Sequence, residues 1–282
     1  MGAYQRFMRN PTRLAPPVPA QYPFASFTIF EGSKCIERIQ CASDQSLSAT
    51  DQPVSLQIGE IGLAIKSDGI AQLNIGESGL GASLIFRPRF GGAMFEKQFP
   101  AAQGGKSDHF WLIAAPLCEV SGEMHIGGST GTPARTIAFS GLGYRDHLFG
   151  SGPAKCWSDC WVRGRILEPR RAIAFQWWDG RRGGAPAECM LVEADENGIR
   201  QLATAIRPQA ALTASGAVLN FGERLRLVEP RILGSWGGLA HTLYQSGEGP
   251  PMALCQAVGT QTGMLKGLIA GARRAFRPDP RA

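Results

Sequence analysis

The sequence lacks the features that mark membrane-spanning and secreted proteins. No apolar run approaches the length needed to cross a bilayer, and the run from Phe110 to Val120 is broken by Pro116. The N-terminus carries arginines but no apolar core followed by a cleavage site, so no signal peptide is predicted. We therefore expect a cytoplasmic protein.

Metal-binding and disulfide patterns are missing as well. The chain has only four histidines, widely scattered, and its seven cysteines form no Cys-x-x-Cys pair. Cys156 and Cys160 would lie roughly 13 Å apart on an extended strand, too far for a disulfide. We expect no metal and no cofactor, and most cysteines to be small buried apolar residues.

A basic face for nucleic acid is also not indicated. Of the net charge of +6, residues 1–30 carry +3 and residues 261–282 carry +4, which leaves −1 for the rest. A nucleic-acid-binding domain carries its basic stripe on the folded body. No nucleic-acid partner is expected.

Long helical periods are absent before Met264, whereas period-two alternation is frequent. With 36 Gly, 19 Pro and 44% hydrophobic residues, the composition is typical of a turn-rich globular protein. Four alternating runs separated by turn residues predict an antiparallel meander with one buried face: Val54/Leu56/Ile58, Ile61/Leu63/Ile65, Ala71/Leu73/Ile75 and Ala82/Leu84/Phe86. The fold class predicted is all-β, in two antiparallel barrel or sandwich domains with a short C-terminal helix.

The predicted division has four parts. Residues 1–20 form a basic, Pro-rich arm, residues 21–130 the first β domain, residues 131–262 the second, and residues 263–282 an amphipathic basic helix and tail. Residues 91–108 lose the alternation and are expected to form a long loop. His125 alternates with buried positions and is expected to face solvent.

The stretch from Gly141 to Gly150 concentrates chemistry in the middle of the chain. If it is extended, Tyr144 and Asp146 share one face, and Arg145 and His147 take the other. A Tyr–Asp pair on the wall of an apolar barrel would be a site. The alternative is a glycine-rich corner, with Tyr144 as a packing residue and Asp146 as a turn cap.

Three segments, residues 109–122, 139–147 and 161–165, together resemble the carotenoid 1,2-hydratase (hydroxyneurosporene synthase) family. The resemblance extends from about residue 22 to residue 176 and rests mainly on the Gly-Tyr-x-Asp-His motif at Gly143–His147. It implies two lipocalin-like barrels, no cofactor, and Asp146 as the proton donor. The motif departs from the family after His147, where Leu148-Phe149 replaces Asn-Trp, and the family's Trp-rich first strand has no counterpart before Tyr22.

Hydration of an isolated alkene requires protonation of carbon, which creates a tertiary carbocation. A buried carboxylic acid can supply the proton, because desolvation favours its neutral form. We therefore predict Asp146 and Tyr144 as catalytic residues. Trp157, Trp161 and His147 are predicted to contact the substrate, since aromatic faces stabilise a cation by about 2 kcal/mol when dry. Paired tryptophans are also common core residues.

The function predicted is hydration of a terminal C=C bond in an acyclic carotenoid or related isoprenoid. Two alternatives stay open: a pericyclase or cyclase of a polyene, and a non-catalytic carrier of an apolar ligand. Residues 264–277 place Leu265, Leu268 and Phe276 on one helical face beside lysine and arginine. This pattern predicts peripheral docking at an anionic inner-membrane surface, or packing against the second domain.

Overall fold

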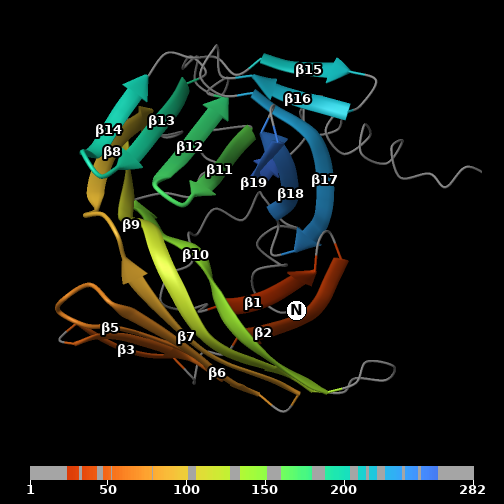
Figure 1. Ribbon diagram of the computed structural model, residues 1–282. Coiled ribbons are helices and arrows are strands. Elements are labelled where there is room, and N and C mark those ends of the chain that lie inside the picture. The colour runs from red at the N-terminus through yellow and green to blue at the C-terminus, as the bar shows by residue number, and fades with distance from the viewer. Residues whose placement is uncertain are drawn as a thin grey trace, which may run out of the picture. The chain divides into compact units, whose positions relative to one another are not determined.

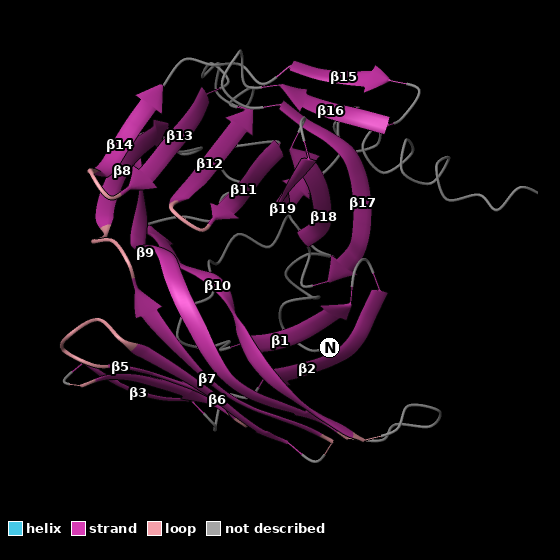
Figure 2. Ribbon diagram, in the orientation of Figure 1, coloured by secondary structure: helices cyan, strands magenta, loops and turns pink. Residues whose placement is uncertain are grey.

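The structure is a computed structural model that describes the strands and the turns that join many of them. The described residues are 24–31, 34–42, 47–51, 53–77, 79–100, 106–127, 134–150, 160–179, 188–203, 209–213, 216–220, 226–236, 239–246 and 249–259. Every regular element within these ranges is a β-strand (Figure 2). Every strand pair whose register is resolved is antiparallel. The predicted all-β class is confirmed.

The strands are labelled in chain order in Figure 1. Their bounds are β1 Phe24–Glu31, β2 Lys34–Ala42, β3 Leu47–Asp51, β4 Val54–Ile58, β5 Ile61–Ile65, β6 Ala71–Glu77, β7 Leu80–Pro88, β8 Ala93–Pro100, β9 Lys106–Ile126, β10 Arg135–Gly150, β11 Cys160–Glu168, β12 Arg171–Asp179, β13 Glu188–Asp195, β14 Gly198–Ala203, β15 Gln209–Thr213, β16 Gly216–Asn220, β17 Arg226–Trp236, β18 Leu239–Ser246 and β19 Gly249–Gly259.

Two compact units divide the chain, and each combines two segments. Unit 1 contains residues 1–89 and 118–143, and unit 2 contains residues 90–117 and 144–282. Strands β9 and β10 therefore each contribute to both units. A compact unit is not the same thing as an independently folding domain, so the predicted domains 21–130 and 131–262 stay a prediction.

Unit 1 contains the predicted meander. Strands β3 to β7 pair in succession, and β7 then pairs with β9. The register places Leu63 opposite Leu73, and Leu73 opposite Leu84, so one face collects the apolar side chains. On β9, His125 is exposed between buried neighbours, as the alternation predicts.

Close packing around Gly143 explains why the central stretch has glycine at this position. A Cβ at this position would lie 3.0 Å from a ring carbon of Phe86 and still closer to a methyl group of Val120. Real Cβ atoms do not approach other atoms so closely, so β10 can lie against β7 and β9 in unit 1 only with glycine here. The next residue, Tyr144, begins the unit 2 part of the strand.

Unit 2 is built on a nine-stranded antiparallel sheet in the order β14-β13-β12-β11-β19-β18-β17-β16-β15 (Figure 1). Strand β12 is buried on both faces from Ala172 to Trp178. A strand covered on both sides does not need to alternate apolar with polar residues. Its neighbours β11 and β13 pair with it without interruption over its length.

The prediction of a long loop over residues 91–108 is wrong. Strand β8 occupies residues 93–100 and pairs with the start of β9, with Phe95 opposite Trp111. Apolar residues lie on both faces of β8. Phe95 and Lys97 are half-buried on one face, and Met94 and Glu96 are exposed on the other. The hydrophobic period that identifies a strand is therefore missing from the sequence.

Several expectations concern residues outside the described ranges: the basic arm of residues 1–20, and the helix and tail of residues 263–282. Among the residues that are described, no helix is long and apolar enough to cross a membrane.

Candidate active site

Strand β10 presents Tyr144 and Asp146 on one face. The Tyr144 hydroxyl donates a hydrogen bond to Oδ2 of Asp146 at 3.2 Å. The pairing follows from the i, i+2 spacing, since alternate residues of a strand point to the same side. The structure brings the two predicted catalytic side chains together, and their catalytic roles stay predictions.

The same oxygen of Asp146 meets two further groups from other strands. The indole Nε1 of Trp111, on β9, donates to Oδ2 at 3.0 Å, and Nη1 of Arg163, on β11, lies 3.6 Å away. The Asp146 side chain keeps only 12% of its surface exposed. Among the described residues no donor reaches Oδ1, so the two oxygens of this carboxyl have different surroundings.

Strand β11 contributes a second arginine to the same wall. Arg165 follows Arg163 by two residues and therefore lies on the same face. Its guanidinium carbon lies 5.2 Å from the centre of the Tyr144 ring, a cation–π distance. Each arginine thus contacts one member of the Tyr144–Asp146 pair.

His109 lies on the same face of β9 as Trp111. Its Nε2 is 3.2 Å from Oε1 of Gln176 on β12, and because an amide oxygen only accepts, Nε2 carries the hydrogen. Burial lowers the pKa of His109; the hydrogen bond to Gln176 opposes that shift, and the charge of Arg163 adds to it. His109 is therefore neutral at neutral pH.

Tyr144 keeps its proton. Burial raises the pKa of its hydroxyl, and the negative charge of Asp146 and the hydrogen bond to it raise that pKa further, against the opposing charges of Arg165 and Arg163. The phenol is consequently a hydrogen-bond donor to Asp146 over the whole physiological pH range.

An apolar cluster surrounds these polar groups. Its buried members are Trp111, Ile113, Ala174, Trp178, Met190 and Val192, and Phe95, Tyr144, Leu148 and Ile199 pack against it. A cavity of about 10 Å³ lies beside Asp146, with Arg163, Arg165 and Phe175 in its wall. That volume is about what one water molecule needs. A larger ligand has to move side chains to reach the carboxyl.

Of the other predicted site residues, only His147 has a described side chain, and it is not part of this cluster. His147 is exposed and on the opposite face of β10, where its ring meets the ring of Phe149 at 5.2 Å. Its odd position relative to Asp146 puts it there, so the contact with substrate predicted for it is not supported. Trp157 lies outside the described residues, and Trp161 belongs to β11 with no description of its side chain.

The site residues predicted from the sequence do not include His109, Trp111, Gln176, Arg163 or Arg165. One signal was present: His109 and Trp111 have the same i, i+2 spacing as Tyr144 and Asp146. Their meeting depends on which strands are neighbours, which spacing does not reveal. Within the described ranges no group of three or more His, Cys, Asp or Glu side chains is arranged to hold a metal ion.

No protein-family model and no curated protein sequence matches the chain. Solved structures do match in fold. A protein of Nitrosomonas europaea provisionally assigned as an AttH aligns with a TM-score of 0.59 and 13% identity, covering 88% of this chain and 83% of that one. Kievitone hydratase from Nectria haematococca aligns with a TM-score of 0.54 and 12% identity, covering 85% and 81%. Identities this low show a shared fold only.

Proposed function

We propose that the chain is a hydro-lyase that adds water to a terminal C=C bond of an acyclic carotenoid or related isoprenoid, with Asp146 as the proton donor. The observation that carries the proposal is the Asp146 carboxyl in an apolar cluster, bound on one oxygen by Trp111 and Tyr144 beside a water-sized cavity. The fold likeness to kievitone hydratase supports the same reaction type.

The proposed reaction begins at the oxygen of Asp146 that receives no donor from the described residues. With Oδ2 held as an acceptor by Trp111 and Tyr144, the proton of the neutral acid sits on Oδ1 and faces the substrate. Transfer of this proton to the terminal alkene carbon breaks the π bond and leaves a tertiary carbocation and the Asp146 carboxylate. The anion then lies beside Arg163.

Aromatic rings and water complete the proposed cycle. The ring faces of Trp111 and Trp178 can stabilise the cation, the task that the sequence analysis gave to Trp157 and Trp161. Water attacks the cation, and the oxonium product loses a proton. Asp146, or the neutral His109 in the same unit, can accept that proton, and the carboxyl must be protonated again before the next turnover.

The test is incubation of the full-length protein with acyclic carotenoids in isotopically labelled water, followed by mass spectrometry. Incorporation of one water by the wild type, and none by Asp146→Asn, is the expected result. Asparagine keeps the size and the hydrogen-bond acceptor but has no acidic proton. Binding without incorporation by the wild type would instead identify a carrier, and equal incorporation by both proteins would remove Asp146 from the mechanism.

Peripheral docking through residues 264–277 remains a second part of the proposal, motivated by their sequence pattern alone. Flotation with anionic liposomes tests it. The full-length protein should float, and a chain that ends at Thr262 should remain at the bottom; equal binding by the two chains would contradict docking by this segment.

A further inference from the structure

The wall of the cavity beside Asp146 holds more positive than negative charge. Among the described residues that line it, Asp146 is the single acid, and Arg163 and Arg165 are two guanidinium groups. Arg163 is 22% exposed and Arg165 is half-buried, so solvent screens their charges only in part. A site that reacts with a hydrocarbon alone needs no such pair of cations.

The strand register extends this polar character beside Arg163, whose partner on β12 is Gln176. Gln176 is 1% exposed, and its side chain reaches His109. Arg163 and Gln176 thus place guanidinium and amide N–H groups on neighbouring strands, and such donors bind the acceptor oxygens of a ligand.

We infer that the substrate of the proposed hydration is an acyclic isoprenoid that carries an oxyanion, a carboxylate or a phosphate, bound by Arg163 and Arg165. This inference rests on the proposed function. Guanidinium groups match both anions with paired hydrogen bonds. The water-sized cavity has room for one oxygen atom of such a group, and Arg165 can turn from the Tyr144 ring to meet it. Side chains of the Trp111–Trp178 cluster have to move to admit the apolar chain, since both rings are 2% exposed.

Binding by the full-length wild type is the first test. Three ligands of equal chain length are compared by titration calorimetry: an acyclic isoprenoid carboxylate, its methyl ester, and the monophosphate of the corresponding alcohol. We expect the anions to bind at least about tenfold more tightly than the ester. A preference for the carboxylate or for the phosphate identifies the natural head group. Equal affinity for the ester and both anions would overturn the inference without any variant.

Substitutions then test whether Arg165 causes the tighter binding of the anions. Arg165→Gln should remove at least about half of the difference in binding free energy, while Arg165→Lys, which keeps the charge but not the planar fork, should retain part of it. Arg170→Gln is the matched control, because it also removes one positive charge from unit 2. The Arg170 side chain lies at a turn and is 83% exposed. Full discrimination by a folded Arg165→Gln protein would overturn the assignment.

The experiments can reject the proposed hydration and the proposed anion binding independently of each other. If the anions bind tightly but incorporate no labelled water, the hydratase function is wrong and the anion subsite stands. If the neutral polyene is hydrated and the anions bind no better than the ester, the function stands and the subsite is wrong.

Discussion

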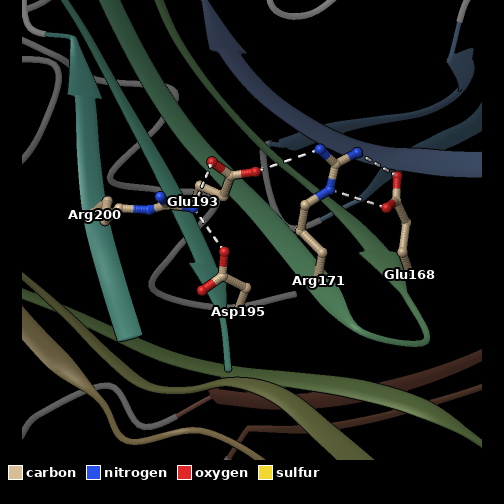
Figure 3. A network of polar contacts seen from close by, with 5 residues as sticks. All are labelled: Glu168, Arg171, Glu193, Asp195 and Arg200. Carbon is tan, nitrogen blue, oxygen red and sulfur yellow. Dashed lines mark hydrogen bonds and ion pairs between the residues drawn. The ribbon is translucent and has the colours of Figure 1, made fainter. Parts of the chain in front are cut away.

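Two clusters of arginine and carboxylate side chains lie in unit 2 and share strand β11, but they are built differently. The first is the candidate site, where Asp146 meets Arg163 at 3.6 Å and takes its hydrogen bonds from Trp111 and Tyr144. The second, here called the charge network, is formed by Glu168, Arg171, Glu193, Asp195 and Arg200 (Figure 3). In it, arginine is the hydrogen-bond donor to every carboxylate.

The geometry of the charge network is that of mutual neutralisation. Arg171 binds Glu168 with two hydrogen bonds of 2.9 Å and reaches Glu193 at 3.3 Å, while Arg200 joins Asp195 at 2.6 Å (Figure 3). The hydrogen bonds to Glu168, with the charges of Glu168 and Glu193, raise the pKa of Arg171 against the opposing effect of burial. These charges bind one another across β11, β12, β13 and β14.

The contrast separates a stabilising role from a chemical one. In the charge network, arginine side chains donate the hydrogen bonds that the carboxylates accept. At the candidate site, the hydrogen bonds to the carboxyl come from the neutral N–H of Trp111 and the O–H of Tyr144, in a cluster of aromatic and aliphatic side chains, and Arg163 lies 3.6 Å away. Such a carboxyl is held in position while its other oxygen stays available to a substrate. Replacing the acid should therefore change mainly the reaction rate at the candidate site and mainly the stability in the charge network.

The largest expected effect is on the reaction. Asp146→Asn should lower the hydration rate by about 10²–10⁴-fold, because the general acid is lost while the side-chain volume is retained. Glu193→Gln, the matched change in the charge network, should leave the rate within about twofold of the wild type. Initial rates of labelled-water incorporation measure both. Comparable losses in the two variants would mean that the clusters do not differ in function.

The second prediction separates the Trp111 hydrogen bond from the Trp111 ring. Trp111→Phe removes the donor to Asp146 and part of a buried ring, and should lower the free energy of unfolding by about 2–4 kcal/mol. Chemical denaturation measures this loss. The hydration rate should also fall, because Asp146 is held less firmly.

Trp177→Phe is the control for that substitution. Trp177 is also buried on β12, and its Nε1 has no hydrogen-bond partner among the described residues. The change therefore removes a similar volume without breaking a hydrogen bond. We expect Trp111→Phe to cost about 1–2 kcal/mol more than Trp177→Phe. Equal costs would show that the Trp111–Asp146 bond contributes little.

The sequence predicted the fold where one face of a strand is buried. The apolar run of β7, Ala82, Leu84 and Phe86, is recognisable because Ser83 and Arg87 on the other face are polar and exposed. Strand β12 does not show this alternation from Ala172 to Trp178, since both of its faces are buried. For β8 the pattern failed, because Met94 is apolar and exposed while Lys97 is half-buried.

The site was predictable only within a strand. Spacing alone pairs Tyr144 with Asp146 and places His147 on the opposite face of the strand. The partners Trp111 and Arg163 come from β9 and β11, and their approach to Asp146 depends on tertiary arrangement. No local pattern of apolar residues contains that information.

The third prediction uses pH. Because burial lowers the pKa of His109 in the native state, the unfolded chain binds a proton near pH 6.5 while the native protein does not. The free energy of unfolding should therefore fall as the pH decreases below about 6.5, by at most about 1.4 kcal/mol per pH unit for this group. His109→Gln should reduce the slope between about pH 5 and 6.5 in denaturation measurements.

His125→Gln provides the comparison for that experiment. The variant removes an exposed imidazole from unit 1, where it hydrogen-bonds the hydroxyl of Thr136, and so controls for the loss of a histidine outside the Asp146 site. A wild-type slope retained in His109→Gln would show that the imidazole is not buried as a neutral group. The site would then contain one more cation than the proposed mechanism allows.

The smallest expected effects concern the charge network itself. Glu193 keeps 16% of its side chain exposed and lies within 3.3 Å of Arg171 and 3.5 Å of Arg200. Glu193→Gln should therefore lower the free energy of unfolding by about 1 kcal/mol at low ionic strength. The loss should shrink as salt is added, since both arginines are about half exposed and their charges are screened.

Arg170→Gln removes a far more exposed pair with Glu196, at 3.2 Å, and should change stability by less than about 0.5 kcal/mol. If Glu193→Gln costs no more than Arg170→Gln at low salt, the charge network does not stabilise unit 2, and its contrast with the Asp146 site disappears.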